Sequence, residues 1–163
     1  MMKHLKLKQL LFFIAISFAI SSCNSTRTAL FDQYSYEKTI KLKVETDQLI
    51  SKATTPYSAN QEEIEKLFLN LEKLVEYEKN KPNNEITFEM LKMLNDKDKN
   101  LLAGFFKHWE TKGVASKSFL QESKKQILEA FDLLLQYEIK KDKQSKEALL
   151  DLINLNTPTY GQR

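Results

Sequence analysis

The stretch NQEEIEKLFLNLEKLVEYEK, residues 60–79, is the clearest helix in the sequence. Its apolar residues recur at intervals of three and four, which places them on one face of an α-helix. Asn60 and Glu63 have the spacing of a capping box, in which each side chain accepts a hydrogen bond from the backbone N–H of the other residue. The apolar face consists of Ile64, Leu67, Phe68, Leu71, Leu74 and Val75. A stripe this wide has to be buried, so the stretch predicts a packed helical domain.

A second helical segment is expected before it, over residues 31–53, with Leu42, Leu49 and Ala53 on one face. Within it, residues 40–45, IKLKVE, alternate as a strand does. We favour a helix here, because a single short strand has no second strand with which to pair.

A third helical segment is expected from about residue 87 to residue 111, and Gly113 is suited to end it. The polar insert NDKDKN, residues 95–100, places Asp98 on the apolar stripe of this segment. Two interpretations stay open: the helix breaks at the insert, or Asp98 faces a hydrated gap. The stripe consists of Met90, Leu91, Leu94, Leu101, Leu102, Phe105 and Trp109.

A fourth helix is expected to begin at Ser116 or Ser118, and a last apolar group follows the lysine-rich residues 140–146. The apolar residues concerned are Leu120, Ile127, Phe131 and Leu134, and then Leu149, Leu150, Leu152 and Ile153. The whole chain has only three glycines and three prolines, which favours long helices. Amphipathic helices joined by short turns pack antiparallel, so we predict an all-α, up-and-down bundle of about four helices.

The front of the chain has a different pattern. A basic start, MMKHLKLKQ, is followed by a run from Leu10 to Ile20 that is apolar apart from Ser17, the order found in secretory signal peptides. The run is too short for a membrane-spanning helix, which needs roughly 20 apolar residues. It leads directly into Ile20-Ser21-Ser22-Cys23, which contains the only cysteine of the chain. This tetrapeptide resembles the lipobox of bacterial lipoproteins.

The resemblance implies cleavage before Cys23, a diacylglycerol on its thiol and an acyl chain such as palmitate on its freed amino group. Two or three acyl chains hold a protein on a membrane far better than one. The chain would then comprise a cleaved signal peptide (1–22), a lipidated tether (23–30), a helical bundle (31–155) and a C-terminal tail (156–163).

The residue after the cysteine bears on which membrane is used. In the enteric lipoproteins that this segment resembles, an aspartate directly after the cysteine signals retention at the inner membrane. This chain has Asn24 at that position. We therefore expect an outer-membrane lipoprotein of the bacterial cell envelope that faces the periplasm, with the inner membrane or the cell surface as alternatives.

The net charge of +3 belongs to the signal peptide. Loss of residues 1–22 removes three lysines and no acidic residue, so the 25 basic residues fall to 22 and equal the 22 acidic ones. Nucleic-acid-binding domains normally carry a basic excess, so we predict no nucleic-acid partner. With Cys23 acylated, no cysteine remains for a disulfide, and the fold has to be held by packing.

Catalytic and metal-binding patterns are missing from the sequence. His108 is the only histidine after residue 22, and Phe105 stands where a di-iron Glu-x-x-His motif needs its glutamate. No nucleophile elbow or phosphate-binding glycine loop accompanies it. The neighbouring carboxylates Glu62 and Glu63 are typical of a helix surface. We therefore predict a non-enzymatic protein with no catalytic, cofactor-binding or metal-binding residue, whose only bound groups are the acyl chains on Cys23.

Two aromatic groups have alternative interpretations. Phe105, Phe106 and Trp109 could form the floor of a ligand pocket, although helical spacing favours the core. Phe31, Tyr34 and Tyr36 follow the tether closely and could lie at a membrane interface, although packing at the end of the bundle is the simpler expectation.

The hypothesis that follows is a membrane-anchored lipoprotein whose helical domain binds a protein partner or supports an envelope assembly. Apolar candidates for the partner surface are Tyr77, Phe106 and residues 149–153. One alternative is a carrier or sensor of a small apolar ligand within the bundle. Another is a periplasmic immunity protein or inhibitor, which is a form of the binding hypothesis.

Overall fold

The structure is a computed structural model that describes residues 28–156. The predicted signal peptide, Cys23 and residues 157–163 lie outside this range. Within it the chain is helical and contains no strand, which confirms the predicted all-α bundle. Its elements are α2 (Gln33–Ser51), a short 3-10 helix (Tyr57–Asn60), α3 (Gln61–Lys79), α4 (Glu85–Leu94), α5 (Leu102–Lys112), α6 (Lys117–Lys140) and α7 (Lys143–Asn156).

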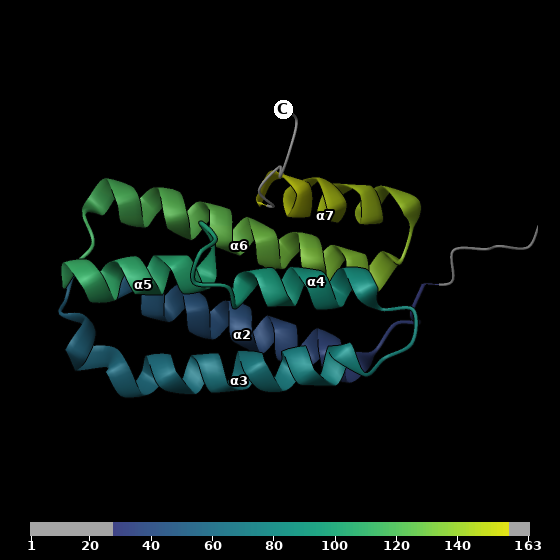
Figure 1. Cartoon of the computed structure of the whole chain (residues 1–163), viewed down its shortest axis with the longest axis horizontal. Helices are drawn as coiled ribbons and strands as arrows, with labels where there is room; N and C mark the ends of the chain where they lie inside the picture. The colour runs from purple at the N-terminus through teal and green to yellow at the C-terminus, as the bar shows by residue number, and fades with distance from the viewer. Residues whose placement is uncertain (1–27, 157–163) are drawn as a thin grey trace, which may run out of the picture.

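The helices run up and down along one axis (Figure 1). Helix α2 packs between α3 and α6, and α3 also packs on α4. Helices α4 and α5 follow one another and together take the place of one long helix (Figure 1). Helix α7 folds back along α6 and covers α6 and α4. The predicted last apolar group thus forms an additional helix, which shields one side of the bundle.

The two ends of the bundle differ in what they contain. At one end, here called the tether end, α2 begins, α3 ends, α4 begins and α6 ends (Figure 1). At the other, here called the far end, α2 and α5 end and α3 and α6 begin. The part of the chain that precedes α2 therefore joins the bundle at the tether end.

The apolar stripes expected from the sequence meet in one core. Phe68, Val75 and Leu120 pack against it while remaining partly exposed. The buried members of the stripes are Leu42, Leu49, Ala53, Ile64, Leu67, Leu71, Leu74, Met90, Leu91, Leu94, Leu101, Leu102, Phe105, Trp109, Ile127, Phe131, Leu134 and Leu149.

The third predicted segment breaks at the polar insert, which decides between the two interpretations. Helix α4 ends at Leu94 and α5 begins at Leu102. Asp98 is exposed and forms an ion pair with Lys107, at 2.9 Å between Oδ1 and Nζ. The insert then passes so close to α5 that a Cβ atom on Gly104 would lie 1.8 Å from the carbonyl oxygen of Lys99. A residue without a side chain is needed at Gly104 for this path.

The capping box predicted for α3 is wrong. Asn60 is the N-cap residue, but its side chain makes no cap hydrogen bond. Its Nδ2 instead donates to Thr55 Oγ1 at 3.0 Å and to the Pro56 carbonyl oxygen at 3.2 Å. Glu63 accepts hydrogen bonds from Lys52 Nζ, at 2.7 and 2.8 Å. Residues of the turn between α2 and α3 thus bind the side chains of Asn60 and Glu63, which the capping-box spacing had predicted to cap α3.

Three other local expectations have clear outcomes. Residues 40–45 lie within α2, so the strand-like alternation does not produce a strand. Gly113 ends α5 with a positive φ of 77°, a backbone conformation that glycine adopts without strain. Of the two possible starts for the fourth helix, Ser116 is the N-cap, and its hydroxyl accepts from the backbone N–H of Phe119.

Candidate functional site

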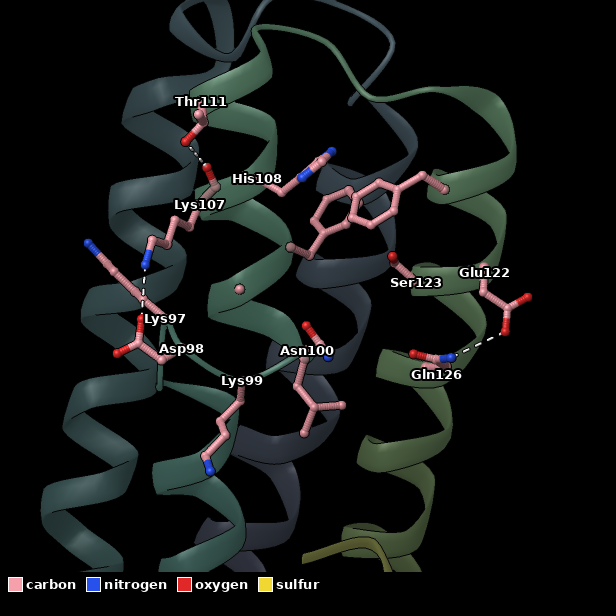
Figure 2. A pocket seen from close by; sticks show the side chains of 14 residues that line it. Lys97, Asp98, Lys99, Asn100, Lys107, His108, Thr111, Glu122, Ser123 and Gln126 are labelled. Carbon is pink, nitrogen blue, oxygen red and sulfur yellow. Dashed lines mark hydrogen bonds and ion pairs between the residues drawn. The ribbon is translucent and has the colours of Figure 1, made fainter. Parts of the chain in front are cut away.

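A groove of about 620 Å³ lies between α5, the first half of α6 and the polar insert that precedes α5 (Figure 2). It occupies the far half of the bundle, from the break between α4 and α5 toward the end where α5 stops and α6 begins. Helix α7 packs on α6 and α4, and its path leaves the side of α6 that faces α5 open to solvent (Figure 1). The groove therefore exists because α7 covers only part of the length of α6.

Aromatic rings form the floor of the groove. Phe105 from α5 and Phe119 from α6 stack with their centroids 5.7 Å apart and their planes inclined by 9°. The ring of His108 lies 4.1 Å from that of Phe119, and His108 is partly exposed on the groove wall (Figure 2). His108 thus occupies a boundary position, and it contributes a polar ring beside an apolar surface.

The rim of the groove is charged. Lys107 pairs with Asp98, and Gln126 Nε2 donates to Glu122 Oε1 at 3.2 Å. Lys97 and Lys99 also line the rim, and neither forms an ion pair with another residue in the described range. The rim thus carries three lysines against two carboxylates next to an aromatic floor, which suits a partner that combines an apolar side chain with an acidic group.

The other predicted aromatic residues belong to the core. Trp109 is fully buried, and its Nε1 donates to the Thr55 carbonyl oxygen at 3.0 Å. Phe106 is buried and packs edge-to-face against Phe68, at 5.5 Å between centroids. Of the three aromatic residues that could form a pocket floor, Phe105 alone lines this groove.

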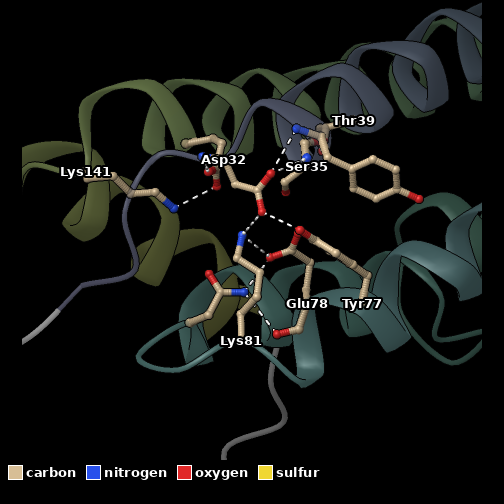
Figure 3. A network of polar contacts seen from close by, with 10 residues as sticks. Asp32, Ser35, Thr39, Tyr77, Glu78, Lys81 and Lys141 are labelled. Atoms are coloured by element: carbon tan, nitrogen blue, oxygen red, sulfur yellow. Dashed lines mark hydrogen bonds and ion pairs between the residues drawn. The ribbon is translucent and has the colours of Figure 1, made fainter.

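A second group of polar side chains joins the helix ends at the tether end (Figure 3). Asp32 is the N-cap of α2 and accepts from the backbone N–H groups of Tyr34 and Ser35, at 2.9 and 3.2 Å. Its other carboxylate oxygen accepts from the Tyr77 hydroxyl at 2.7 Å and lies 3.1 Å from Lys81 Nζ. Asp32 thereby ties the start of α2 to the end of α3.

Two glutamates of this network are buried. Glu78, with a fully buried side chain, lies 3.0 Å from Lys81 Nζ and accepts from Asn84 Nδ2 at 2.5 Å. Glu138, at the end of α6, accepts from the backbone N–H of Asp32 at 3.0 Å and from Lys141 Nζ at 2.7 Å. Each buried carboxylate has a lysine partner, so the network is typical of structural ion pairs that hold four helix ends together.

The network shifts the pKa values of its members. Burial raises the pKa of Asp32, but hydrogen bonds from Tyr77 and Ser35 and the Lys81 ammonium outweigh burial and hold the pKa below its ordinary value of 3.8. Burial lowers the pKa of Lys81, but Glu78 and Asp32 outweigh burial and raise the pKa above 10.5. The charged forms of both groups are therefore stabilised by the fold.

Stability is expected to fall in acid through Asp32. A carboxyl whose folded-state pKa is depressed contributes stability that is present above its unfolded value and is lost as the pH falls through the folded value. Below pH 3.8, the free energy of unfolding should therefore decrease more steeply in the wild-type chain than in an Asp32→Asn variant. Urea unfolding from about pH 5.5 to pH 2.5 measures this difference, and parallel curves for the two chains would contradict it.

The structure places the remaining sequence candidates as follows. Glu62 and Glu63 are exposed in the first turn of α3. Phe106 and Leu149 are buried, so their prediction as exposed partner-binding residues is wrong, whereas Tyr77 is exposed at the tether end. Cys23, the predicted lipidation site, lies outside the described residues.

Sequence reasoning missed the tether-end network, although the sequence contains a signal for it. Glu78 follows Leu71 and Leu74 at seven and four residues, so it lies on the apolar stripe of α3. Glu138 follows Phe131 and Leu134 at the same spacing on α6. A carboxylate at a buried stripe position needs a partner, and this rule could have identified both glutamates.

Comparison with known proteins adds no family: no protein-family model, no curated protein and no solved structure matches the chain. Between residues 28 and 156, no helix is both long enough and apolar enough to cross a bilayer. The same residues contain no group of three or more histidine, cysteine or acidic side chains arranged to hold a metal ion.

Proposed function

We propose that the chain is a lipoprotein of the bacterial outer membrane, anchored through Cys23 and facing the periplasm, whose helical domain binds a protein partner in the groove between α5 and α6. The observation that carries the proposal is the position of the groove. It lies in the far half of the bundle, whereas the part of the chain that precedes α2 joins the bundle at the tether end (Figure 1).

This arrangement suits a protein held by its N-terminus. The backbone N–H of Ala29 donates to the Asn83 carbonyl oxygen at 2.9 Å, so the chain is attached to the bundle from that residue onward. An acylated Cys23 is six residues before Ala29, a span of at most about 20 Å. Helix α6 has 24 residues and is therefore about 36 Å long. A bundle standing on its tether end would present the groove well away from the bilayer.

The chemistry of the groove favours a protein segment over a small apolar ligand. Ten of its 14 lining residues are polar or charged, and the hollow is open to solvent. A carrier of small apolar ligands needs an enclosed cavity, and this hollow is not enclosed. A peptide segment with an apolar side chain for the Phe105–Phe119 floor and an acidic residue for Lys97 or Lys99 matches what the groove offers. A toxin or hydrolase neutralised by an immunity protein would be one such partner.

The proposal is tested by photocrosslinking in intact cells of the source organism. A photoreactive amino acid at Gln126, which is exposed and lines the groove, should yield one discrete crosslinked protein. The same group at Val44, an exposed position on α2, is the matched control and should yield none. Charge reversal by Lys97→Glu and Lys99→Glu should abolish the crosslink, because the acidic group of the partner would be repelled.

The anchor is tested in the same cells. Cys23→Ser should release the protein from the membrane fraction, and the mass of the wild-type protein should include the acyl chains. Equal crosslinking from Gln126 and Val44, or a crosslink unaffected by charge reversal, would contradict the groove as the binding site. Membrane retention of Cys23→Ser without acyl mass in the wild type would contradict the anchor.

A further inference from the structure

Exposed apolar and aromatic side chains gather at the tether end. The exposed fractions are 87% for Leu30, 48% for Phe31, 45% for Tyr34 and 39% for Tyr77. Leu30 and Phe31 precede α2, Tyr34 lies in its first turn and Tyr77 lies near the end of α3. These four residues are here called the aromatic face.

The aromatic face has two parts, one formed by Leu30 and Phe31 and the other by Tyr34 and Tyr77, and Lys81 lines the hollow beside each part. The rings of Tyr34 and Tyr77 are 4.7 Å apart although they belong to different helices, and the Tyr77 hydroxyl is held by Asp32. One shallow hollow is lined by Leu30, Phe31 and neighbouring residues, and another by Tyr34 and Tyr77. The expectation that the early aromatic residues pack into the end of the bundle therefore fails for Phe31 and Tyr34, since both remain about half exposed.

Lysines accompany the tyrosines of the face. Lys38 Nζ lies 5.1 Å from the ring centroid of Tyr34, and Lys81 Nζ lies 5.6 Å from that of Tyr77. Tyrosine rings are enriched at membrane–water interfaces, and an exposed lysine such as Lys38 can lay its alkyl chain on the lipid while its ammonium stays hydrated. The Lys81 ammonium is instead paired with Asp32 and Glu78. The composition of the face thus matches the headgroup region of a bilayer.

The tether limits how far the face can be from a membrane. Ala29 is six positions after Cys23, so acyl chains on Cys23 would bring the face to within about 20 Å of the lipid. We infer that the aromatic face lies in the headgroup region of the bilayer, with Leu30 and Phe31 inserted and the two tyrosines at the interface. This inference rests on the proposed acylation of Cys23, and it orients the bundle with its groove facing away from the membrane.

The test uses the acylated full-length product in nanodiscs of phosphatidylethanolamine and phosphatidylglycerol. The sequence has one cysteine, so with Cys23 acylated an introduced cysteine is the only free thiol. Asn80→Cys, next to the face, and Val114→Cys, at the far end, are each labelled with an environment-sensitive fluorophore. The label at position 80 should shift its emission to shorter wavelength and lose intensity when the lipids are brominated. The label at position 114 should do neither.

A second variant separates the face from simple proximity to the anchor. Leu30→Glu with Phe31→Glu should abolish the quenching at position 80, while circular dichroism and acylation stay unchanged. Val44→Glu with Leu69→Glu, at exposed apolar positions away from the tether end, is the matched control and should leave the quenching intact. Acylated protein without quenching at position 80, or with quenching that survives Leu30→Glu and Phe31→Glu, overturns the membrane contact alone. Absence of acyl mass on Cys23 overturns the anchor as well.

Discussion

Replacing Lys81 with methionine is expected to lower the free energy of unfolding by about 3–5 kcal/mol. The Lys81 ammonium lies 3.0 Å from a carboxylate oxygen of Glu78 and 3.1 Å from one of Asp32 (Figure 3). Glu78 is completely buried, so the substitution leaves a charge in the interior without a compensating partner. Urea unfolding of the Cys23→Ser chain, followed by far-ultraviolet circular dichroism at neutral pH, measures the loss.

The matched control is Lys79→Met. Lys79 pairs with Glu76 at 3.4 Å, and both side chains are more than half exposed. Exposed pairs of this kind contribute about 0–1 kcal/mol, so the control should unfold almost as the wild type does. Adding Glu78→Leu to Lys81→Met should recover part of the loss, because the uncompensated charge is then removed. Equal effects of Lys81→Met and Lys79→Met would refute the structural role of the network.

Replacing Trp109 with alanine, in a chain that is otherwise wild type, is expected to lower the free energy of unfolding by about 3–5 kcal/mol. Trp109 is fully buried and lies 5.5 Å from Tyr57 and 5.8 Å from Phe106, measured between ring centroids. Its indole N–H also satisfies the Thr55 carbonyl oxygen in the turn between α2 and α3. Alanine leaves a cavity and an unpaired carbonyl group. The same unfolding measurement applies, since circular dichroism does not depend on the lost fluorophore.

A graded pair of variants distinguishes the cavity from the hydrogen bond. Trp109→Phe keeps most of the volume and loses the indole N–H, so it should cost clearly less than Trp109→Ala. A matched control is Phe31→Ala at the half-exposed face, which should change the stability little. Equal free energies of unfolding for Trp109→Ala and Phe31→Ala would contradict a stabilising role for the packing of Trp109 against the turn before α3.

The helices could be predicted because their signals are local. The apolar residues of α3 recur with the helical period over 19 residues, and the structure buries four of them at the expected positions, Ile64, Leu67, Leu71 and Leu74. The capping box failed for the opposite reason. Its spacing is local, but Asn60 and Glu63 find partners in Thr55, Pro56 and Lys52, which the turn and α2 bring to them.

The groove could not be predicted from the same signals. It requires the break before α5, the close approach of Lys99 to Gly104, and a last helix, α7, that covers only part of α6. Phe105 lies on a predicted apolar stripe, but Phe119 does not, and their stacking across two helices forms an aromatic floor that helical spacing does not indicate. The period of a helix shows which face is apolar, but it does not show how far a neighbouring helix extends.

The sequence by itself determined the helical class and the apolar faces, and it gave the expectation of a lipid anchor at Cys23, because each depends on residues close together in the chain. It predicted about four helices where the structure has six α-helices between residues 28 and 156. The tertiary structure alone decided which helix ends meet. It placed Asp32, Glu78 and Glu138 together from segments as much as 106 residues apart, and it left the aromatic face at one end and the groove at the other. The physical reason is that ion pairs and exposed surfaces arise from the packing of whole helices, which local spacing does not encode.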